Sequence, residues 1–155
     1  MTIIVKKYDR PGEYKEIILY DKVGEQKGFA SVMRATRPGV YRLRVEAVHT
    51  APGTGGRIVV RGIARNGAQV ELSGMIKIEK TAQKTDNYLE LRMLLLDDKS
   101  RATVEPLLEI KANEVKAGHA ASVSKIDEEQ VLYLMSRGVS REEAEEQIIE
   151  GWLSV

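Results

Sequence analysis

The chain has 155 residues, with 24 lysines and arginines against 23 aspartates and glutamates, and it contains no cysteine. At this length a compact domain buries about 70% of the surface that its unfolded chain exposes, which argues against intrinsic disorder. A net charge of +1 argues against a protein that coats nucleic acid. The missing cysteines exclude disulfides, zinc fingers and an ordinary cysteine-ligated iron–sulfur cluster held by this chain alone.

Two features of the whole chain bear on its location in the cell and on its division into structural parts. The N-terminal segment Met1–Lys7 has no signal-peptide pattern, and no stretch reaches the roughly 18 apolar residues of a membrane span, so we expect a soluble, cytoplasmic protein. Residues 126–155 contain eight acids and two bases, a net charge of −6, which leaves +7 on residues 1–125. We therefore expect two structural parts with a boundary near residue 126.

Residues 1–125 are predicted to form β-strands. The clearest pattern is Val70–Glu79, in which apolar and polar residues alternate with the period of two that places them on opposite faces of a strand. In chain order, the predicted strands are Ile3–Lys7, Tyr14–Tyr20, Tyr41–Val48, Arg57–Ile63, Val70–Glu79, Leu89–Leu95 and Leu107–Lys111.

Turn signals separate these strands, and none of the gaps is long enough for a crossover helix. Two all-β architectures fit: an antiparallel sandwich or meander, and a solenoid in which successive short strands stack into coils. The pair Asn66-Gly67 favours a tight hairpin on local grounds, because both residues accept the positive φ of a type I′ turn. The same pair also fits a solenoid corner.

Residues 126–153 are predicted to form a helical hairpin. Asp127 is expected to cap a first helix, Glu128–Arg137, which ends at Gly138. Ser140 and Glu143 have the spacing of a capping box and begin a second helix. On that helix, apolar residues recur at every fourth position: Ala144, Ile148 and Trp152.

Several short blocks of the sequence follow one another in an order known from one protein family. They are His49–Pro52, Ile63–Ala64, Leu72–Gly74, Ala82–Asn87, Leu94–Leu96, Pro106–Ile110, Glu114–Val123 and Tyr133–Ala144. Together they resemble the C-terminal part of the SufB/SufD proteins of the SUF iron–sulfur cluster assembly system. The similarity covers roughly residues 41–153, and the first 40 residues match only in style.

The resemblance implies a right-handed parallel β-helix over residues 1–125, followed by C-terminal helices over residues 126–155. It also implies a complex with the ABC-type ATPase SufC, in which the C-terminal helices dock on the ATPase and the β-helices pair into a dimer. Family members are much longer, with an N-terminal helical region and more coils. This chain is therefore expected to be a minimal member or a fragment.

The solenoid interpretation predicts self-association. A β-helix that begins at Ile3–Val5 without a capping helix leaves unpaired N–H and C=O groups along its first coil. We expect a homodimer, or in the cell a heterodimer with a SufB/SufD paralogue. This chain alone is expected to hold no cofactor, and a dimer interface is where iron or an iron–sulfur cluster would bind.

His119 is the best single candidate for a metal ligand, because a neutral imidazole can ligate iron. The alternative is a histidine that is hydrogen-bonded at the end of the last coil or in the dimer interface. Compared with the family, Ala117 replaces a cysteine of the SufD-like branch and Ala120 replaces a glutamate of the SufB-like branch. Two candidate ligands are thus missing, and Glu109 is the remaining carboxylate that we associate with His119.

The helical hairpin is the strongest functional element, because it has more apolar surface than one short hairpin can bury against itself. Helices that dock in a groove of a partner use such anchors. The resemblance supplies an ABC-type ATPase as the partner. The predicted partner-binding residues are Tyr133, Leu134, Arg137, Gly138 and Trp152.

The function that we expect is a non-enzymatic component of an iron–sulfur cluster assembly complex. One alternative is a cupin-like metal-dependent enzyme that uses His49, His119 and Glu109, although the closely spaced His-x-His cluster of that fold is missing. For His49 we favour a turn-stabilising role. The other alternative is a purely structural solenoid that serves as an interaction module.

Overall fold

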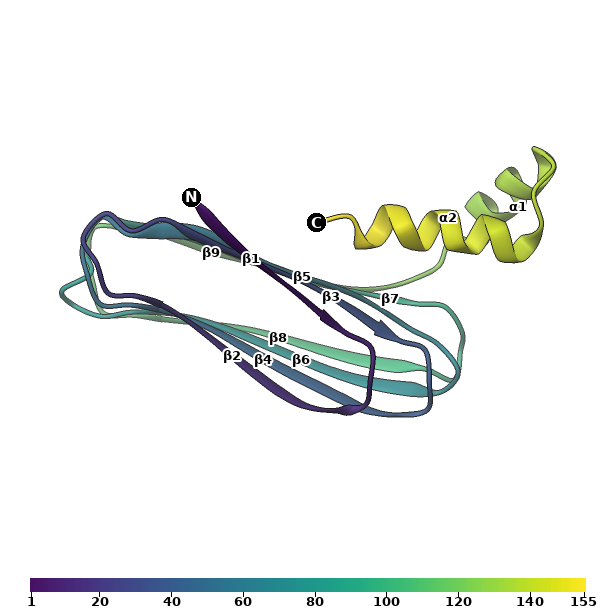
Figure 1. Ribbon diagram of the computed structural model, residues 1–155, viewed down its shortest axis with the longest axis horizontal. Helices are drawn as coiled ribbons and strands as arrows, with labels where there is room; N and C mark the ends of the chain where they lie inside the picture. The colour runs from purple at the N-terminus through teal and green to yellow at the C-terminus, as the bar shows by residue number, and fades with distance from the viewer.

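The computed structural model describes residues 1–155 and shows nine strands followed by two helices (Figure 1). The odd-numbered strands form one sheet and the even-numbered strands form a second sheet that faces it. The elements are β1 (Thr2–Tyr8), β2 (Gly12–Tyr20), β3 (Lys27–Ala35), β4 (Gly39–His49), β5 (Gly55–Ala64), β6 (Ala68–Ile78), β7 (Thr85–Leu95), β8 (Arg101–Ile110), β9 (Val115–Lys125), α1 (Glu128–Ser136) and α2 (Arg141–Leu153).

The strand order identifies the architecture as a parallel β-solenoid. The orders are β1-β3-β5-β7-β9 and β2-β4-β6-β8, and every neighbouring pair is parallel. Each coil of the chain therefore adds one strand to each sheet. The solenoid prediction is confirmed, and the antiparallel sandwich or meander is excluded.

All seven predicted strands are present, but β3 and β9 were not predicted. In β3, small or polar residues such as Gly28 and Ser31 occupy buried positions, so no alternation of large apolar residues is visible. In β9, alanine and glycine fill much of the strand. In addition, β8 begins at Arg101 rather than at Leu107.

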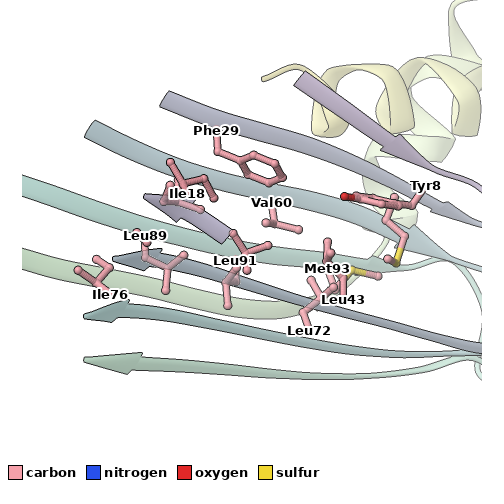
Figure 2. Packing of buried hydrophobic residues seen from close by; sticks show 14 of the residues in the cluster. Tyr8, Ile18, Phe29, Leu43, Val60, Leu72, Ile76, Leu89, Leu91 and Met93 are labelled. Carbon is pink, nitrogen blue, oxygen red and sulfur yellow. The ribbon is translucent and has the colours of Figure 1, made fainter. Parts of the chain in front are cut away.

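The core lies between the two sheets, in the space that we call the lumen (Figure 2). Residues in register on neighbouring parallel strands point to the same side, so the alternation seen in the sequence becomes aligned apolar rows. Leu43, for example, is in register with Leu72, and Val60 with Leu91. The apolar face predicted for Val70–Glu79 is buried in this core.

The pair Asn66-Gly67 forms a corner between β5 and β6, which belong to different sheets, and not a hairpin. Both residues have positive φ, 58° and 78°, as the dipeptide suggested. The Asn66 side chain donates to the Thr36 carbonyl at 2.9 Å, and its backbone N–H donates to Asp97 at 2.6 Å. The corner therefore ties together the coils before and after it.

The two ends of the solenoid differ in chemistry. At the first coil, Lys6 of β1 and Glu16 of β2 pair across the lumen at 2.8 Å, and Tyr8 donates to the same carboxylate at 2.6 Å. At the last coil, lumen-facing residues such as Leu108 and Val123 are apolar and partly exposed, at 38% and 42%. Strands β8 and β9 each pair on one side only, so their other edges are open.

Helices α1 and α2 lie beside one end of the odd-numbered sheet (Figure 1). Neither helix has the length and apolar character needed to cross a membrane. Helix α2 contacts β5, and α1 lies on the far side of α2 from the solenoid.

Candidate functional site

The helical hairpin is built by local capping signals. The Asp127 side chain accepts from the Glu129 N–H at 2.9 Å, and α1 ends before Gly138, whose φ is 99°. At the start of α2, the Glu143 N–H donates to the Ser140 hydroxyl and the Ser140 N–H donates to the Glu143 carboxylate, at 3.1 and 2.9 Å. The predicted capping box is therefore formed, and it fixes a short turn between the helices.

Helix α1 presents an exposed apolar surface, which we call the Tyr133 surface and define as Leu132, Tyr133, Leu134 and Arg137. Tyr133 is 58% exposed and Leu132 is 54% exposed. Arg137 donates to the Tyr133 hydroxyl at 3.0 Å, and its guanidinium lies 5.4 Å from the ring centroid. This contact restrains the tyrosine ring against Arg137, while both side chains remain exposed to solvent.

Beside this surface lies a shallow hollow of about 350 Å³. Its lining includes Tyr133 and the half-buried Leu134 from α1 and Ile148 from α2. Gly138 is exposed at the adjacent turn, with open space where a side chain would extend. The structure thus brings four of the five predicted partner-binding residues together. Leu132, which is 54% exposed beside them, was not among the predicted residues.

Trp152, the fifth predicted residue, lies elsewhere. Its indole Nε1 donates to the Gly62 carbonyl of β5 at 3.0 Å, so the ring is directed at the solenoid. Around it, Ile149 and Leu153 of α2 pack on Ile63 of β5 and Leu94 of β7. Trp152 therefore seats the hairpin on the sheet.

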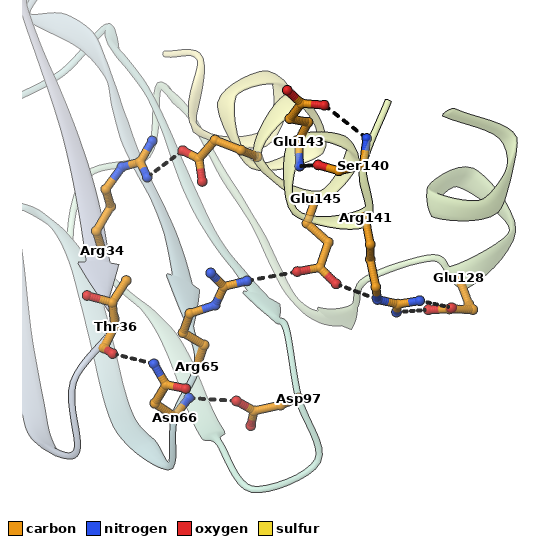
Figure 3. A network of polar contacts seen from close by, with 11 residues as sticks. Arg34, Thr36, Arg65, Asn66, Asp97, Glu128, Ser140, Arg141, Glu143 and Glu145 are labelled. Atoms are coloured by element: carbon orange, nitrogen blue, oxygen red, sulfur yellow. Dashed lines mark hydrogen bonds and ion pairs between the residues drawn. The ribbon is translucent and has the colours of Figure 1, made fainter. Parts of the chain in front are cut away.

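A series of ion pairs joins the solenoid to both helices (Figure 3). Arg65, which follows β5, pairs with Glu145 of α2 at 3.0 Å. Arg141 pairs with Glu145 at 3.1 Å and binds both carboxylate oxygens of Glu128 on α1 at 2.7 Å. The Arg141 guanidinium holds the pKa of the Glu128 carboxyl below its usual range. Arg34 of β3 adds a further pair to α2, with Glu146 at 2.9 Å.

Sequence patterns did not reveal this series, apart from the i,i+4 spacing of Arg141 and Glu145. Arg65 and Glu145 are separated by 80 residues in the chain, and Arg141 and Glu128 belong to different helices. Exposed pairs of this kind each contribute little to stability. Their arrangement nevertheless couples the position of α1 to that of the sheet, through α2.

The two residues predicted to bind metal lie on different sheets. His119 of β9 is exposed and in register with the buried Leu89, which places it on the lumen side of the open last coil. Glu109 of β8 is in register with Lys77, outside the lumen, and lies 3.6 Å from the Lys111 ammonium. No three histidine, aspartate or glutamate side chains are grouped as a metal site. One imidazole without thiolates does not fit an iron–sulfur cluster.

His49, at the end of β4, is fully buried in a polar network. Its Nδ1 lies 2.8 Å from the Thr54 hydroxyl and its Nε2 lies 2.6 Å from the Asn87 side-chain nitrogen. Its ring stacks on Tyr20 with the centroids 4.0 Å apart. Burial lowers the pKa of His49 to about 4, so the ring is neutral at pH 7. Both nitrogens are engaged, in agreement with a structural role.

The sequence comparisons add family membership to this geometry. Residues 22–152 match the family described as "SUF system FeS cluster assembly, SufBD core domain". The chain belongs to the SufBD core family. The match begins within the first 40 residues, where we had expected similarity in style only. It includes strands β3 to β9 and both helices up to Trp152.

Curated relatives agree with this assignment. The chain is 39% identical over 109 residues to the iron–sulfur cluster assembly protein SufD of Bacillus subtilis, which is 70% of this chain and 25% of the relative. It is 34% identical over 130 residues to iron–sulfur cluster assembly SufBD family proteins of Staphylococcus epidermidis and Staphylococcus aureus, which is 84% of this chain and 28% of each relative. The chain thus corresponds to about a quarter of the length of these SufBD proteins.

Proposed function

We propose that this chain is a non-enzymatic component of an iron–sulfur cluster assembly complex. In this proposal, residues 126–155 bind an ABC-type ATPase of the SufC class, and residues 1–125 pair with a second copy or with a SufB/SufD paralogue. Membership of the SufBD core family supports the assembly role. The division at residue 126 coincides with the change from the last strand to the first helix.

The proposal that residues 126–155 bind an ATPase rests mainly on one observation. Tyr133 is exposed on a hairpin that is itself fixed to the solenoid. A partner bound to the Tyr133 surface would bury a tyrosine and an arginine, the residue types that most often dominate binding energy at protein interfaces. The ion pairs through Arg141 and Arg65 would carry a displacement of α1 to the sheet. A scaffold that responds to ATPase movement needs a connection of this kind.

The pairing part is supported by the open last coil. Strands β8 and β9 leave their outer edges unpaired, and lumen-facing residues such as Ile110, 41% exposed, stay accessible there. Unpaired edges of this kind readily add strands from another chain. Pairing at this end would also bring His119 to the interface, where donors from a second chain would be needed to complete any iron site.

The ATPase part is tested with Tyr133→Ala and isothermal titration calorimetry against the SufC-class ATPase of the same organism. We expect the dissociation constant to rise about thirtyfold or more, as for a buried aromatic anchor. Ile17→Ala is the control, because Ile17 is as exposed as Tyr133, at 58%, but lies on β2 of the solenoid. Circular dichroism checks that both variants stay folded.

Equal affinity of Tyr133→Ala and the parent chain would refute this docking surface. If the parent chain itself bound no ATPase, the function would instead be that of a structural solenoid module. The cupin-like alternative has no support in the structure, because the fold is a solenoid and His49 is enclosed in its hydrogen-bond network.

A further inference from the structure

Helix α2 covers only part of the outer face of the odd-numbered sheet. It packs near the C-terminal ends of the strands, on Ile63 of β5 and Leu94 of β7. Toward the starts of the same strands, no other element lies over the face (Figure 1). We call this uncovered part the bare face and define it by outward residues that the strand register places side by side: Val5, Arg57, Val59, Tyr88, Glu90 and Arg92.

The bare face carries an excess of positive charge. Glu90 is only 4% exposed, and its carboxylate is shared by Arg57 at 3.1 Å, Arg61 at 3.1 Å and Arg92 at 3.4 Å. Arg61 also donates to the Trp152 and Ser154 carbonyls at the end of α2, so Arg57 and Arg92 against one carboxylate leave a local charge of +1 on the bare face. Arg57 and Arg92 are 58% and 43% exposed, and a guanidinium has five N–H donors, so donors remain available to a further acceptor.

The same sheet already holds one acidic helix, which shows what this face binds. Arg34 and Arg65 pair with Glu146 and Glu145 of α2 at 2.9 and 3.0 Å. Next to these pairs, the apolar side of α2 rests on apolar residues of the strands. Arginines beside an apolar strip are therefore the combination by which this sheet seats an acidic amphipathic helix.

The bare face repeats that combination. Arg57 and Arg92 lie near the half-buried Val59, and the Arg57 guanidinium lies 5.2 Å from the centroid of the Tyr88 ring. The exposed Val5 lies in the same row as Val59, one strand beyond Ala30 of β3. Arg57 and Arg92 each pair with one carboxylate, that of Glu90, whereas Arg141 on the hairpin pairs with two. Carboxylates are thus the groups that this surface is complementary to.

We propose that the bare face docks an acidic amphipathic helix of a partner protein. The carboxylates of that helix bind Arg57 and Arg92, and its apolar side packs on Val5, Val59 and Tyr88. Helix α2 of a second copy is already packed on its own sheet, which disfavours α2 as the docked helix. The surface is separate from the Tyr133 surface and from the open edge of the last coil, and the proposal does not depend on the proposed function.

A labelled peptide of residues 140–155 is the probe, because it is an acidic helix that this sheet is shown to seat. Fluorescence anisotropy at low salt measures its binding to the full chain, and we expect saturable binding. The double variant Arg57→Ala, Arg92→Ala is expected to weaken it about tenfold or more, since each guanidinium–carboxylate pair is charge-assisted. The double variant Arg42→Ala, Arg44→Ala, which removes equal charge from the other sheet, is expected to bind as the parent does.

Four results would overturn the proposal. The first is the lack of saturable binding, and the second is equal binding by the Arg57, Arg92 variant. The third is a loss of binding in Arg34→Ala alone, which would show that the peptide exchanges with α2 at its own seat. Self-association of the chain that disappears in the Arg57, Arg92 variant would assign the surface to a second copy and would likewise contradict a different partner.

Discussion

At the scale of single residues, the network around His49 shows how a polar group is accommodated inside the lumen. The Thr54 hydroxyl donates to the Ala51 carbonyl at 3.1 Å, so its oxygen accepts from His49 Nδ1–H. Nε2 then accepts from the Asn87 amide. This assignment satisfies both ring nitrogens of a neutral imidazole, and burial of the ring disfavours a second ring proton. Protonation of His49 is therefore opposed by the fold.

The pH dependence of stability follows from this. In the unfolded chain His49 binds a proton near pH 6.5, whereas in the folded chain its pKa is about 4. The contribution of neutral His49 to the free energy of unfolding is therefore fully present above pH 6.5. It decreases as the pH falls toward 4, by at most about 3 kcal/mol. Urea unfolding at pH 7, 6 and 5 measures this decrease, and His49→Gln is expected to remove most of it between pH 6.5 and 5.

The control is His119→Gln, since His119 is the only other histidine and is exposed. It is expected to keep the pH dependence of the parent chain. Identical slopes for the parent and His49→Gln would show that other groups, and not His49, cause the pH dependence.

At the scale of elements, the coils pack so closely at one corner that only glycine fits. A Cβ on Gly56, near the start of β5, would lie 1.8 Å from the Lys27 carbonyl oxygen. Gly56→Ala is expected to lower the free energy of unfolding by about 3 kcal/mol, the upper end of the usual range for overpacking. Gly151→Ala is the contrasting variant, because nothing lies within 4 Å of its position on α2. It is expected to raise stability by up to about 1 kcal/mol, since alanine favours helix.

Denaturant unfolding of the two alanine variants measures both changes. A Gly56→Ala protein as stable as the parent would mean that the corner relaxes to admit a methyl group. Loss of stability in Gly151→Ala would contradict the exposed position of this residue.

Elements whose signals are local were predictable from the sequence. The hairpin follows from Asp127, Gly138 and Ser140, because caps act within a few residues of the chain. The strand at 70–79 follows from its alternation, because one of its faces is buried. The strand β9 was missed, because small residues carry no periodic signal. The seating of Trp152 on Gly62 was equally invisible, since it depends on residues 90 positions apart.

At the scale of the whole molecule, the two ends of the solenoid are expected to behave differently toward a second copy. An ion pair between Lys6 and Glu16 crosses the lumen at the first coil, whereas Ile110 and Val123 leave an apolar lumen at the last coil. Because stacking on the first coil would require this pair to be desolvated, the last coil is the more favourable site of association.

This difference predicts which edge forms a dimer. Val123→Lys is expected to raise the dimer dissociation constant at least about tenfold, because a lysine at an edge strand opposes pairing. Ile4→Lys on β1, whose lumen-facing side chain is 39% exposed, is the matched control and is expected to leave the dimer intact. Sedimentation velocity at micromolar concentration measures both. A monomeric parent chain, or equal weakening by the two lysines, would contradict the prediction.

The position of the acidic hairpin gives the molecule an electric polarity. A net charge of −6 is gathered in residues 126–155 near one end of the long axis, and +7 is spread over the solenoid (Figure 1). Although the total is close to zero, the two centres of charge are separated, and the molecule has a dipole moment. A basic partner is therefore turned toward the hairpin, and an acidic one toward the sheets, while each is still diffusing. Such orientation before contact raises the association rate. The effect becomes weaker as salt screens the electric field of the protein.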